Sequence, residues 1–266
     1  MSKKKAIIGR CKLTGNTGRY VKSHILPRAL TKPELNGERL LQLEPQVGIS
    51  HRRDSWYDKN LVCSEGEAIL SNLDNYGIHE LRKHNLVWSA SYPIGKAQLP
   101  IGKKLLHAEG ELTVTIDDPN RFRRFWASLL WRSAASLLPD MADVQLPPDH
   151  TEQLRAEVTG ETAVDPFFYP ISLMHFCTTG PRHNFTTITR FLAEEPPRNF
   201  YLRHEMDGIV SLSFPLMKKS DLPFSDWNVV VGNSKCLHIL SRPYQDSWAH
   251  ENLKLAIKQT RNGSGG

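Results

Sequence analysis

The segment that most constrains the fold is a long amphipathic pattern in the middle of the chain, at residues 117–131. It opens on Asp117, Asp118 and Pro119, and acidic residues followed by proline are typical of the first turn of a helix. Apolar side chains then recur at helical spacing over a broad face, at Phe122, Phe125, Trp126, Leu129, Leu130 and Trp131. A helix with such a face has to be buried against other elements, so we expect it in the core.

The segments around this helix predict an α+β protein. Helices are expected at residues 64–84, 149–158 and 247–258. Ser64 and Glu67 have the spacing of a capping box, and Gly77 is a point at which the first of these helices is expected to break.

Strands are predicted mainly in the C-terminal half, at residues 167–176, 200–203, 208–216 and 227–240. Met-Asp-Gly at residues 206–208 is a hairpin signal between two of them. Near the N-terminus, a turn-rich stretch and an alternating segment at residues 20–27 together predict a hairpin, and residues 31–54 are expected to be a loop with short extended pieces.

Charge divides the chain into two parts. Residues 1–90 hold 15 Lys and Arg against 9 Asp and Glu, whereas residues 91–266 hold 19 of each. Proline and glycine at residues 86–103 mark a plausible boundary. We therefore expect a basic N-terminal module over residues 1–90 and a mixed helix and antiparallel-sheet domain of unknown role over residues 91–261. Residues 262–266 have the composition of an added linker and are set aside.

Localised positive charge favours a polyanionic partner, because neutralising phosphates releases counterions. A solubility tail is the alternative, since Lys3, Lys4 and Lys5 supply half of the excess. No stretch approaches the roughly 18 apolar residues of a membrane helix, and no apolar run follows the basic N-terminus as in a secretory signal. Four widely spaced cysteines favour free thiols and a cytoplasmic protein.

Three segments of the basic module form a pattern when they are taken together. They are Gly-Arg-Cys-Lys-Leu-Thr-Gly at 9–15, Ser-His-Ile-Leu-Pro at 23–27 and Tyr-Asp-Lys-Asn-Leu-Val-Cys-Ser-Glu-Gly-Glu at 57–67. The pattern resembles the HNH nuclease family, also called the ββα-metal fold. It is most similar to a bacterial branch with a Cys-x-x-Cys hairpin, a Ser-His-Ile-x-Pro strand and a Leu-Cys-x-x-Cys-Glu helix start. The resemblance covers residues 9–90 well and the remainder loosely.

The resemblance implies a nuclease site built on His24. This histidine would be the general base that activates water, a task suited to a group that titrates near neutral pH. It would share a divalent metal with Glu67, whose oxygen ligand suits Mg²⁺ or Mn²⁺. Asp58, or alternatively Asn60, would orient His24. Basic side chains would hold the nucleic-acid backbone, namely Arg10, Lys12, Lys22, Arg28, Arg52 and Arg53.

Each of these assignments has a structural alternative. A histidine beside proline on a strand is commonly structural, and Glu67 fits a capping box with Ser64. Asp58 and Asn60 are residue types that shape turns. Asp74 lies on the same helical face as Glu67, and a solvated acid is the simpler interpretation of it.

Two departures from the family pattern weaken the resemblance to an active enzyme. Members of this branch hold a structural zinc with two Cys-x-x-Cys pairs, but Thr14 and Gly66 occupy the places of the second cysteines. Cys11 and Cys63 alone cannot supply four ligands, so we predict no zinc and a knuckle held by packing, with a disulfide open to them under oxidising conditions. Ser23 also stands where the family often has a metal-binding Asp.

Other combinations of metal-binding residue types were weighed. His175, Cys177 and His183 form one such combination, but residues 167–176 are predicted to be a buried strand, which favours a core role. Cys236 and His238 share one face of a strand, but two residues do not make a site. No P-loop, dinucleotide-binding or nucleophile-elbow motif is present, so NTP hydrolysis, hydride transfer and serine hydrolysis have no sequence support.

Three hypotheses follow. The favoured one is a divalent-metal-dependent endonuclease that cleaves DNA, with double-stranded DNA as its partner and bacterial anti-phage defence as the role that the resemblance suggests. The second is a catalytically reduced nucleic-acid-binding or sensor module that keeps the fold without turnover. The third places the main activity in residues 91–261, through a protein partner, a ligand or a second copy of the chain. The sequence does not distinguish DNA from RNA.

Overall fold

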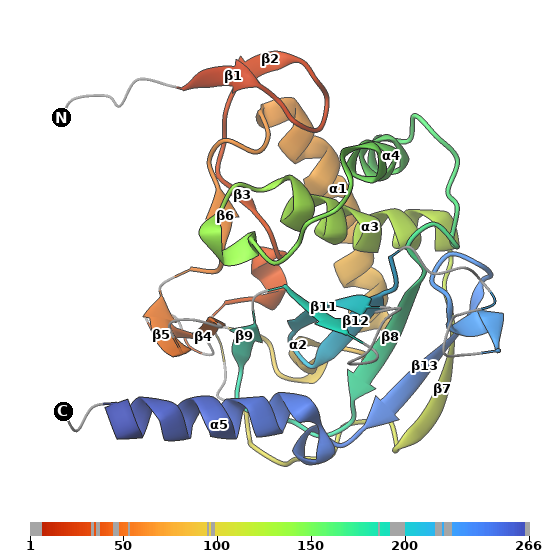
Figure 1. The fold of residues 1–266 in the computed structure, drawn as a ribbon. Coiled ribbons are helices and arrows are strands. Elements are labelled where there is room, and N and C mark those ends of the chain that lie inside the picture. The colour runs from red at the N-terminus through yellow and green to blue at the C-terminus, as the bar shows by residue number, and fades with distance from the viewer. Residues whose placement is uncertain are drawn as a thin grey trace.

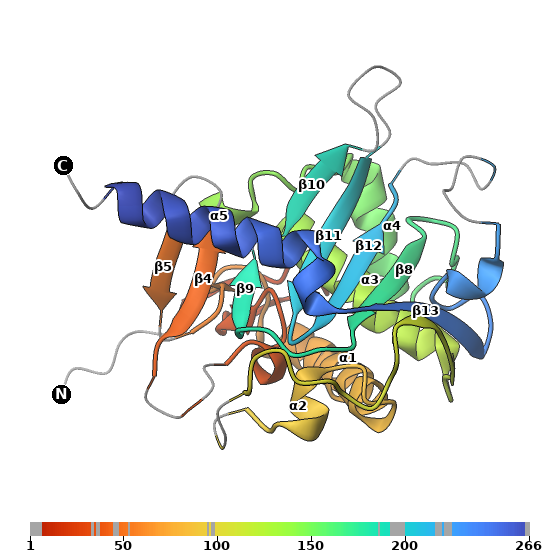
Figure 2. The same ribbon diagram turned by 90° about the horizontal axis from the view of Figure 1, so that it is seen from below.

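A six-stranded sheet lies between two layers of helices in the computed structural model (Figures 1 and 2). The structure describes residues 7–32, 35, 38–44, 48–52, 54–94, 96, 99–185, 187–191, 200–215, 220 and 225–263. On one face of the sheet lie the helices α1 (Ser64–Lys83), α3 (Pro119–Ala135) and α4 (Pro148–Thr159), and α5 (Trp248–Gly263) crosses the other face. The expected α+β class is confirmed.

The large sheet is antiparallel apart from one parallel pair. Its order is β10 (Ile188–Phe191), β11 (Phe200–Met206), β12 (Ile209–Ser213), β8 (Ile171–Phe176), β13 (Cys236–Arg242) and β7 (Gly110–Thr115). Strands β13 and β8 form the parallel pair. Because side chains alternate along a strand, Leu173 and Ile239 pack into the cluster formed with the helices, whereas Met174 packs with Leu253 of α5.

Helix α3 lies at the centre of the core, as the sequence predicts. The Asp118 side chain accepts a hydrogen bond from the Arg121 backbone N–H at 2.9 Å, and Pro119 occupies the first turn, so both predicted start signals are in place. Phe125 and Leu129 are fully buried. The helix packs against both α1 and α4, which explains why its apolar face is so broad.

Helix α1 corrects two predictions. Its N-cap residue is Cys63 and no side chain caps it, so the capping box predicted for Ser64 and Glu67 is wrong. The helix also continues through Gly77 without a break. A Cβ atom at Gly77 would lie 2.2 Å from Cγ of Phe125, so this glycine allows α1 and α3 to approach closely.

The other sequence predictions differ mainly in their boundaries. Residues 227–240 were expected to be one strand, but Trp227–Val229 is a short 3-10 helix, η4, and β13 begins at Cys236. The expected strand at 167–176 begins only at Ile171. Strand β7 was not predicted. Helix α5 extends to Gly263, so the segment set aside as a linker begins within a helix.

The N-terminal third contains three small pairings of strands. Strands β1 (Ile8–Arg10) and β2 (Thr17–Arg19) form a hairpin, but the segment predicted at residues 20–27 is not its second strand. Within that segment, β3 (Ser23–His24) pairs antiparallel with β6 (Tyr57–Asp58) instead. Between β3 and β6 lies a hairpin of β4 (Leu40–Glu44) and β5 (Gly48–Arg52) in the region expected to be a loop. A short helix, α2 (Trp88–Ser91), follows α1.

The basic N-terminal part and the remainder are joined by both a sheet and a core. Strand β4 pairs in parallel with β9 (His183–Phe185), which lies far along the chain. One hydrophobic cluster contains Cys11 and Ile25 from the N-terminal part together with Leu130 and Ile239. The β3–β6 pair is therefore held in place by elements from the whole chain. Among the described residues, no helix is both long and apolar enough to span a bilayer.

Candidate active site

Strand β3 places the two residues of its Ser-His pair in different surroundings. Ser23 lies opposite Asp58, and His24 lies opposite Tyr57, in the antiparallel pair with β6. Consecutive side chains on a strand point to opposite faces of it. The Ser23 residue is 1 % exposed, whereas the His24 side chain keeps 16 % of its surface exposed. The two faces of β3 therefore differ in their access to solvent.

On the outer face, His24 is held by Asp54, a residue that the sequence did not single out. Nε2 of His24 lies 3.1 Å from Oδ1 of Asp54. The Lys22 ammonium also bonds to Asp54, and Nε of Arg28 lies 3.6 Å from it. One carboxylate thus collects an imidazole and two cations. We call Lys22, His24, Arg28 and Asp54 the His24 cluster.

The protonation states in the His24 cluster follow from these contacts. Partial burial raises the pKa of Asp54, but the hydrogen bonds from Lys22 and His24 outweigh burial and hold that pKa below its usual value. Burial lowers the pKa of His24, and the contact with Asp54 offsets this only in part. At neutral pH the imidazole is therefore uncharged and donates its Nε2 proton to the ionised Asp54. Its Nδ1 atom then carries the lone pair that a general base needs.

On the inner face, the partly buried Glu67 belongs to a group of polar residues that includes the buried Ser23 and Arg132. Burial raises the pKa of Glu67, while the Ser23 hydroxyl and the charge of Arg132 lower it in part. Neither Oγ of Ser23 nor Oε2 of Glu67 has a hydrogen-bond partner within the described residues, so their approach is looser than a hydrogen bond. Glu67 thus faces the side of β3 that His24 does not.

Arg132 of α3 anchors this inner face. Its Nη2 and Nη1 atoms donate to the two carboxylate oxygens of Asp74 at 2.6 and 3.1 Å, and Arg132 is 1 % exposed. Nη1 also donates to the backbone oxygen of His24 at 3.2 Å. Asp74 is thus paired with a buried arginine, which corrects its interpretation as a solvated acid. We call Ser23, Glu67, Asp74 and Arg132 the inner network.

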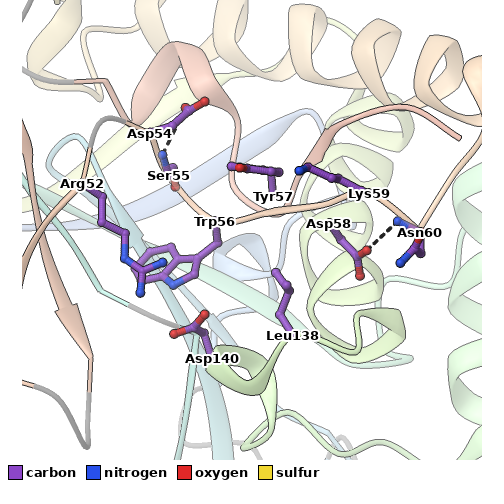
Figure 3. Close-up of a pocket in the computed structure, with 10 residues that line it drawn as sticks. All are labelled: Arg52, Asp54, Ser55, Trp56, Tyr57, Asp58, Lys59, Asn60, Leu138 and Asp140. Carbon is purple, nitrogen blue, oxygen red and sulfur yellow. Dashed lines mark hydrogen bonds between the residues drawn. The ribbon is translucent and has the colours of Figure 1, made fainter. Parts of the chain in front are cut away.

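Asp58 and Asn60 shape the turn before α1 and do not contact His24. Oδ1 of Asp58 accepts the backbone N–H of Asn60 at 2.7 Å (Figure 3). Oδ2 of Asp58 accepts the Ser136 hydroxyl at 2.9 Å. Asp58 is 6 % exposed, whereas Asn60 is exposed. Both oxygens of Asp58 are engaged elsewhere, and the carboxylate that contacts the His24 imidazole is that of Asp54.

A cleft of about 560 Å³ adjoins the His24 cluster (Figure 3). The chain from Asp54 to Asn60 runs along one side of it, and Leu138 and Asp140 lie on the other side. Asp54 and Tyr57 connect this cleft to His24, because both contact the imidazole. Lys22 lies over the Tyr57 ring, with Nζ 3.9 Å from the ring centre. An extended ligand in the cleft would therefore pass the His24 cluster.

The basic residues expected to hold a nucleic-acid backbone fall into separate groups. Lys22 and Arg28 belong to the His24 cluster, and Arg52 lines the adjoining cleft. Arg10 and Lys12 line a different cleft of about 650 Å³ next to α4. Nζ of Lys12 donates to the Ala135 backbone oxygen at 2.6 Å. Arg53 lies outside the described residues. The expected single basic face is thus divided between two clefts.

The four positions that correspond to the family's zinc knuckle meet in space. Burial raises the pKa of the Cys11 thiol, but hydrogen bonds, first among them that of the Thr14 side chain, bring it below its usual value. Burial and the charge of the neighbouring Cys11 raise the pKa of Cys63. A Cβ atom on Gly66 would lie 2.7 Å from Sγ of Cys11, so the glycine packs directly on the thiol. Both cysteines are free and buried.

The metal implied by the family resemblance does not fit the directions of His24 and Glu67. The two side chains face opposite sides of β3, and each is engaged with different partners. Within the described residues, neither belongs to a group of three His, Cys, Asp or Glu side chains whose ligand atoms converge.

His175 has the core role that the sequence favoured. It is fully buried, its Nδ1 lies 3.0 Å from the Leu86 backbone oxygen, and burial lowers its pKa to about 4. Cys177 is 5 % exposed.

Comparisons of the chain with protein-family models, with curated proteins and with solved structures found no match. The function is therefore inferred from the geometry of the site.

Proposed function

We propose that the chain hydrolyses nucleic-acid phosphodiester bonds, with DNA as the expected substrate and His24 as the general base. The observation that carries this proposal is an uncharged imidazole that is held through Nε2 by Asp54, so that Nδ1 can accept a proton. Two cations and one carboxylate also leave the His24 cluster with net positive charge. Such a cluster suits the approach of a phosphate group.

The order of elements supports the resemblance to ββα-metal nucleases. The antiparallel pair β3–β6 is followed directly by α1. The meeting of Cys11, Thr14, Cys63 and Gly66 at one point is a second independent feature of that pattern. Both features arise from long-range contacts that the motif alone does not guarantee.

The proposed reaction uses the residues of the His24 cluster in named roles. Nδ1 of His24 takes a proton from water, and the water oxygen attacks phosphorus as the P–O bond to the leaving oxygen breaks. Lys22 and Arg28 stabilise the negative charge that develops on the phosphate oxygens. A proton from solvent completes the leaving hydroxyl. Asp54 is a positioning residue, because it fixes the tautomer of His24 and stabilises the imidazolium that forms.

A second candidate function is nucleic-acid binding without turnover. It is favoured by one observation, the inward direction of Glu67, which leaves His24 without the metal partner that the resemblance implies. In this case the His24 cluster would bind phosphate as part of a sensor or adaptor. Binding of this kind weakens steeply as the salt concentration rises.

Nicking of supercoiled plasmid separates the two candidates. The chain would be incubated with Mg²⁺, with Mn²⁺ and with EDTA, alongside His24→Ala and the control His79→Ala, which alters an exposed histidine of α1. We expect the unaltered chain and the control to nick at equal rates and His24→Ala to be slower by about 100-fold or more. Salt-sensitive binding with no nicking under any condition would establish the second candidate instead. Failure to bind or cleave either DNA or RNA would reject both.

A further inference from the structure

Three metal-binding side chains converge at the far edge of the large sheet, away from the His24 cluster. They are Glu111 of β7, Asp226 just before η4, and His238 of β13, and their ligand atoms all lie within 4.8 Å of one another. Nδ1 of His238 is 2.5 Å from Oδ2 of Asp226 and 3.5 Å from Oε1 of Glu111. The three residues come from three separate elements of the fold.

The sheet register explains why these side chains meet. His238 pairs with Thr113 and Leu240 pairs with Glu111, so Glu111 is the diagonal neighbour of His238 on the same face. Asp226 is fixed differently, because its Oδ1 accepts the Asn228 backbone N–H at 2.9 Å and its Oδ2 is left to face His238. Sequence patterns alone place only Cys236 and His238 on one face, and two residues do not make a site.

The charge of this group calls for a cation. Glu111 and Asp226 each contribute an acidic side chain, and both approach Nδ1 of His238. Two carboxylates then face one imidazole. In the part of the chain that the structure describes, no lysine or arginine forms an ion pair with Glu111 or Asp226. The group therefore keeps negative charge that its own neighbours do not neutralise.

We propose that Glu111, Asp226 and His238 bind a divalent transition-metal ion, with Zn²⁺ as the reference ion. An imidazole nitrogen beside two carboxylate oxygens suits Zn²⁺, Mn²⁺, Co²⁺ or Ni²⁺, whereas Mg²⁺ and Ca²⁺ prefer oxygen ligands alone. Three protein ligands leave a position for water or another ligand, as in sites where zinc is not fully enclosed.

The surroundings of His238 suit a metal ligand. Sγ of Cys236 lies 3.5 Å from Nε2, so the ring nitrogen that faces away from the carboxylates has a partner that fixes the ring orientation. Glu111 and His238 also line a cleft of about 300 Å³ whose other lining residues are mainly apolar. The side chains of Glu111 and Asp226 are 63 % and 43 % exposed, so an ion reaches the site from solvent without rearrangement of the core.

Isothermal titration of Zn²⁺ into the EDTA-treated full chain tests the site. His238→Ala is compared with His79→Ala, which removes an exposed histidine from α1 and serves as the matched control. We expect the unaltered chain and the control each to bind one more equivalent of Zn²⁺ than His238→Ala binds. We expect Glu111→Gln and Asp226→Asn each to raise the Kd by about tenfold or more.

Comparison with His238→Ala subtracts any zinc bound elsewhere, for instance at the buried thiols. Glu111→Gln alters an exposed side chain and keeps the test valid if His238→Ala fails to fold. Absorption bands of tetrahedral Co²⁺ that disappear in His238→Ala would support the same site. Identical isotherms for the unaltered chain and for folded His238→Ala and Glu111→Gln, or no uptake of zinc by the unaltered chain, would overturn the proposal.

Discussion

The two faces of strand β3 use ionisable groups in different ways. On the outer face, the His24 cluster lies beside a cleft, and Lys22 and Arg28 keep 41 % and 59 % of their side-chain surface exposed. On the inner face, Arg132 is buried and forms two hydrogen bonds with Asp74. Ser23 and His24 are adjacent in one short motif, yet Ser23 faces the inner network and His24 belongs to the His24 cluster.

Solvent access decides how much a charged pair contributes to the stability of the fold. An exposed ion pair contributes roughly 0–1 kcal/mol to stability, because water screens it and long side chains lose freedom. Breaking a buried pair costs about 3–5 kcal/mol, since the remaining charge has no solvent. We therefore expect substitutions on the inner face to act on folding and substitutions on the outer face to act on function.

The largest expected effect comes from Arg132→Ala. The substitution leaves Asp74 and Glu67 without their shared cation and removes the hydrogen bond to the His24 backbone. We expect the free energy of unfolding to fall by about 3–5 kcal/mol, as measured by urea denaturation. The control Lys254→Ala breaks an exposed pair with Glu251 on α5, and it should leave the free energy of unfolding nearly unchanged. Equal losses in the two variants would contradict the division between the faces.

Asp54→Asn is expected to affect catalysis more than folding. Cleavage should slow by about 10- to 100-fold because His24 loses the carboxylate that orients it, while stability should change by about 1 kcal/mol or less. Asp54 also raises the pKa of His24, so its loss should move the acid limb of the pH–rate profile to lower pH. An unchanged profile with a large loss of stability would assign Asp54 to the scaffold instead.

Glu67 and Asp54 should give opposite dependences of stability on pH. The pKa of Glu67 is raised above its usual value of 4.5, so the folded state loses stability as the pH rises from 4.5 through the folded pKa. The pKa of Asp54 lies below its usual value of 3.8, so its contribution is present above 3.8 and is lost as the pH falls through the folded pKa. Urea denaturation between pH 3 and 8 would show this contrast.

Glu67→Gln removes the carboxylate that causes this loss of stability at higher pH. Measured against the unaltered protein, the variant should therefore be relatively more stable at pH 7 than at pH 4. Asp54→Asn should flatten the loss of stability on the acid side. A Glu67→Gln variant whose stability follows the same pH curve as the unaltered chain would contradict the burial of an ionised carboxylate on the inner face.

Ser23→Ala should have the smallest effect. Its hydroxyl is buried without a hydrogen-bond partner among the described residues, so its removal relieves a desolvation cost while it leaves only a small void. We expect a change in stability of about 1 kcal/mol or less in either direction, and an unchanged cleavage rate. A large loss of either would show that Ser23 makes a contact that is tighter than the geometry indicates.

Local patterns predicted the helices and much of the sheet. The start signals and apolar face of α3 are contained in a single segment, and the Met206–Gly208 turn joins β11 to β12 as expected. Tertiary packing determines the features that local patterns did not predict correctly. Gly77 serves the close contact between α1 and α3 and does not end a helix. Strand β7 is defined mainly by its pairing with β13, which lies more than a hundred residues later.

The candidate site shows the same limit more sharply. His24 was found from its motif, but its partner Asp54 lies 30 residues away, and Arg132 reaches the His24 backbone across 108 residues. The far site on the sheet combines residues from three elements, of which the sequence paired only Cys236 and His238 on one face. Such contacts depend on how the tertiary fold brings loops next to the sheet, and the spacing of residues within one segment does not predict them.

A side-by-side comparison of cleavage by His24→Ala and Glu67→Gln tests the division between the two faces most directly. Both variants would be assayed on the same plasmid with Mn²⁺ and with EDTA, after denaturation curves establish that each is folded. We predict that His24→Ala loses about 100-fold or more in rate while Glu67→Gln stays within a few-fold of the unaltered chain. Equal losses of cleavage rate in the two variants, seen with Mn²⁺ but not with EDTA, would show that the two side chains act together on a metal. This result would contradict the account.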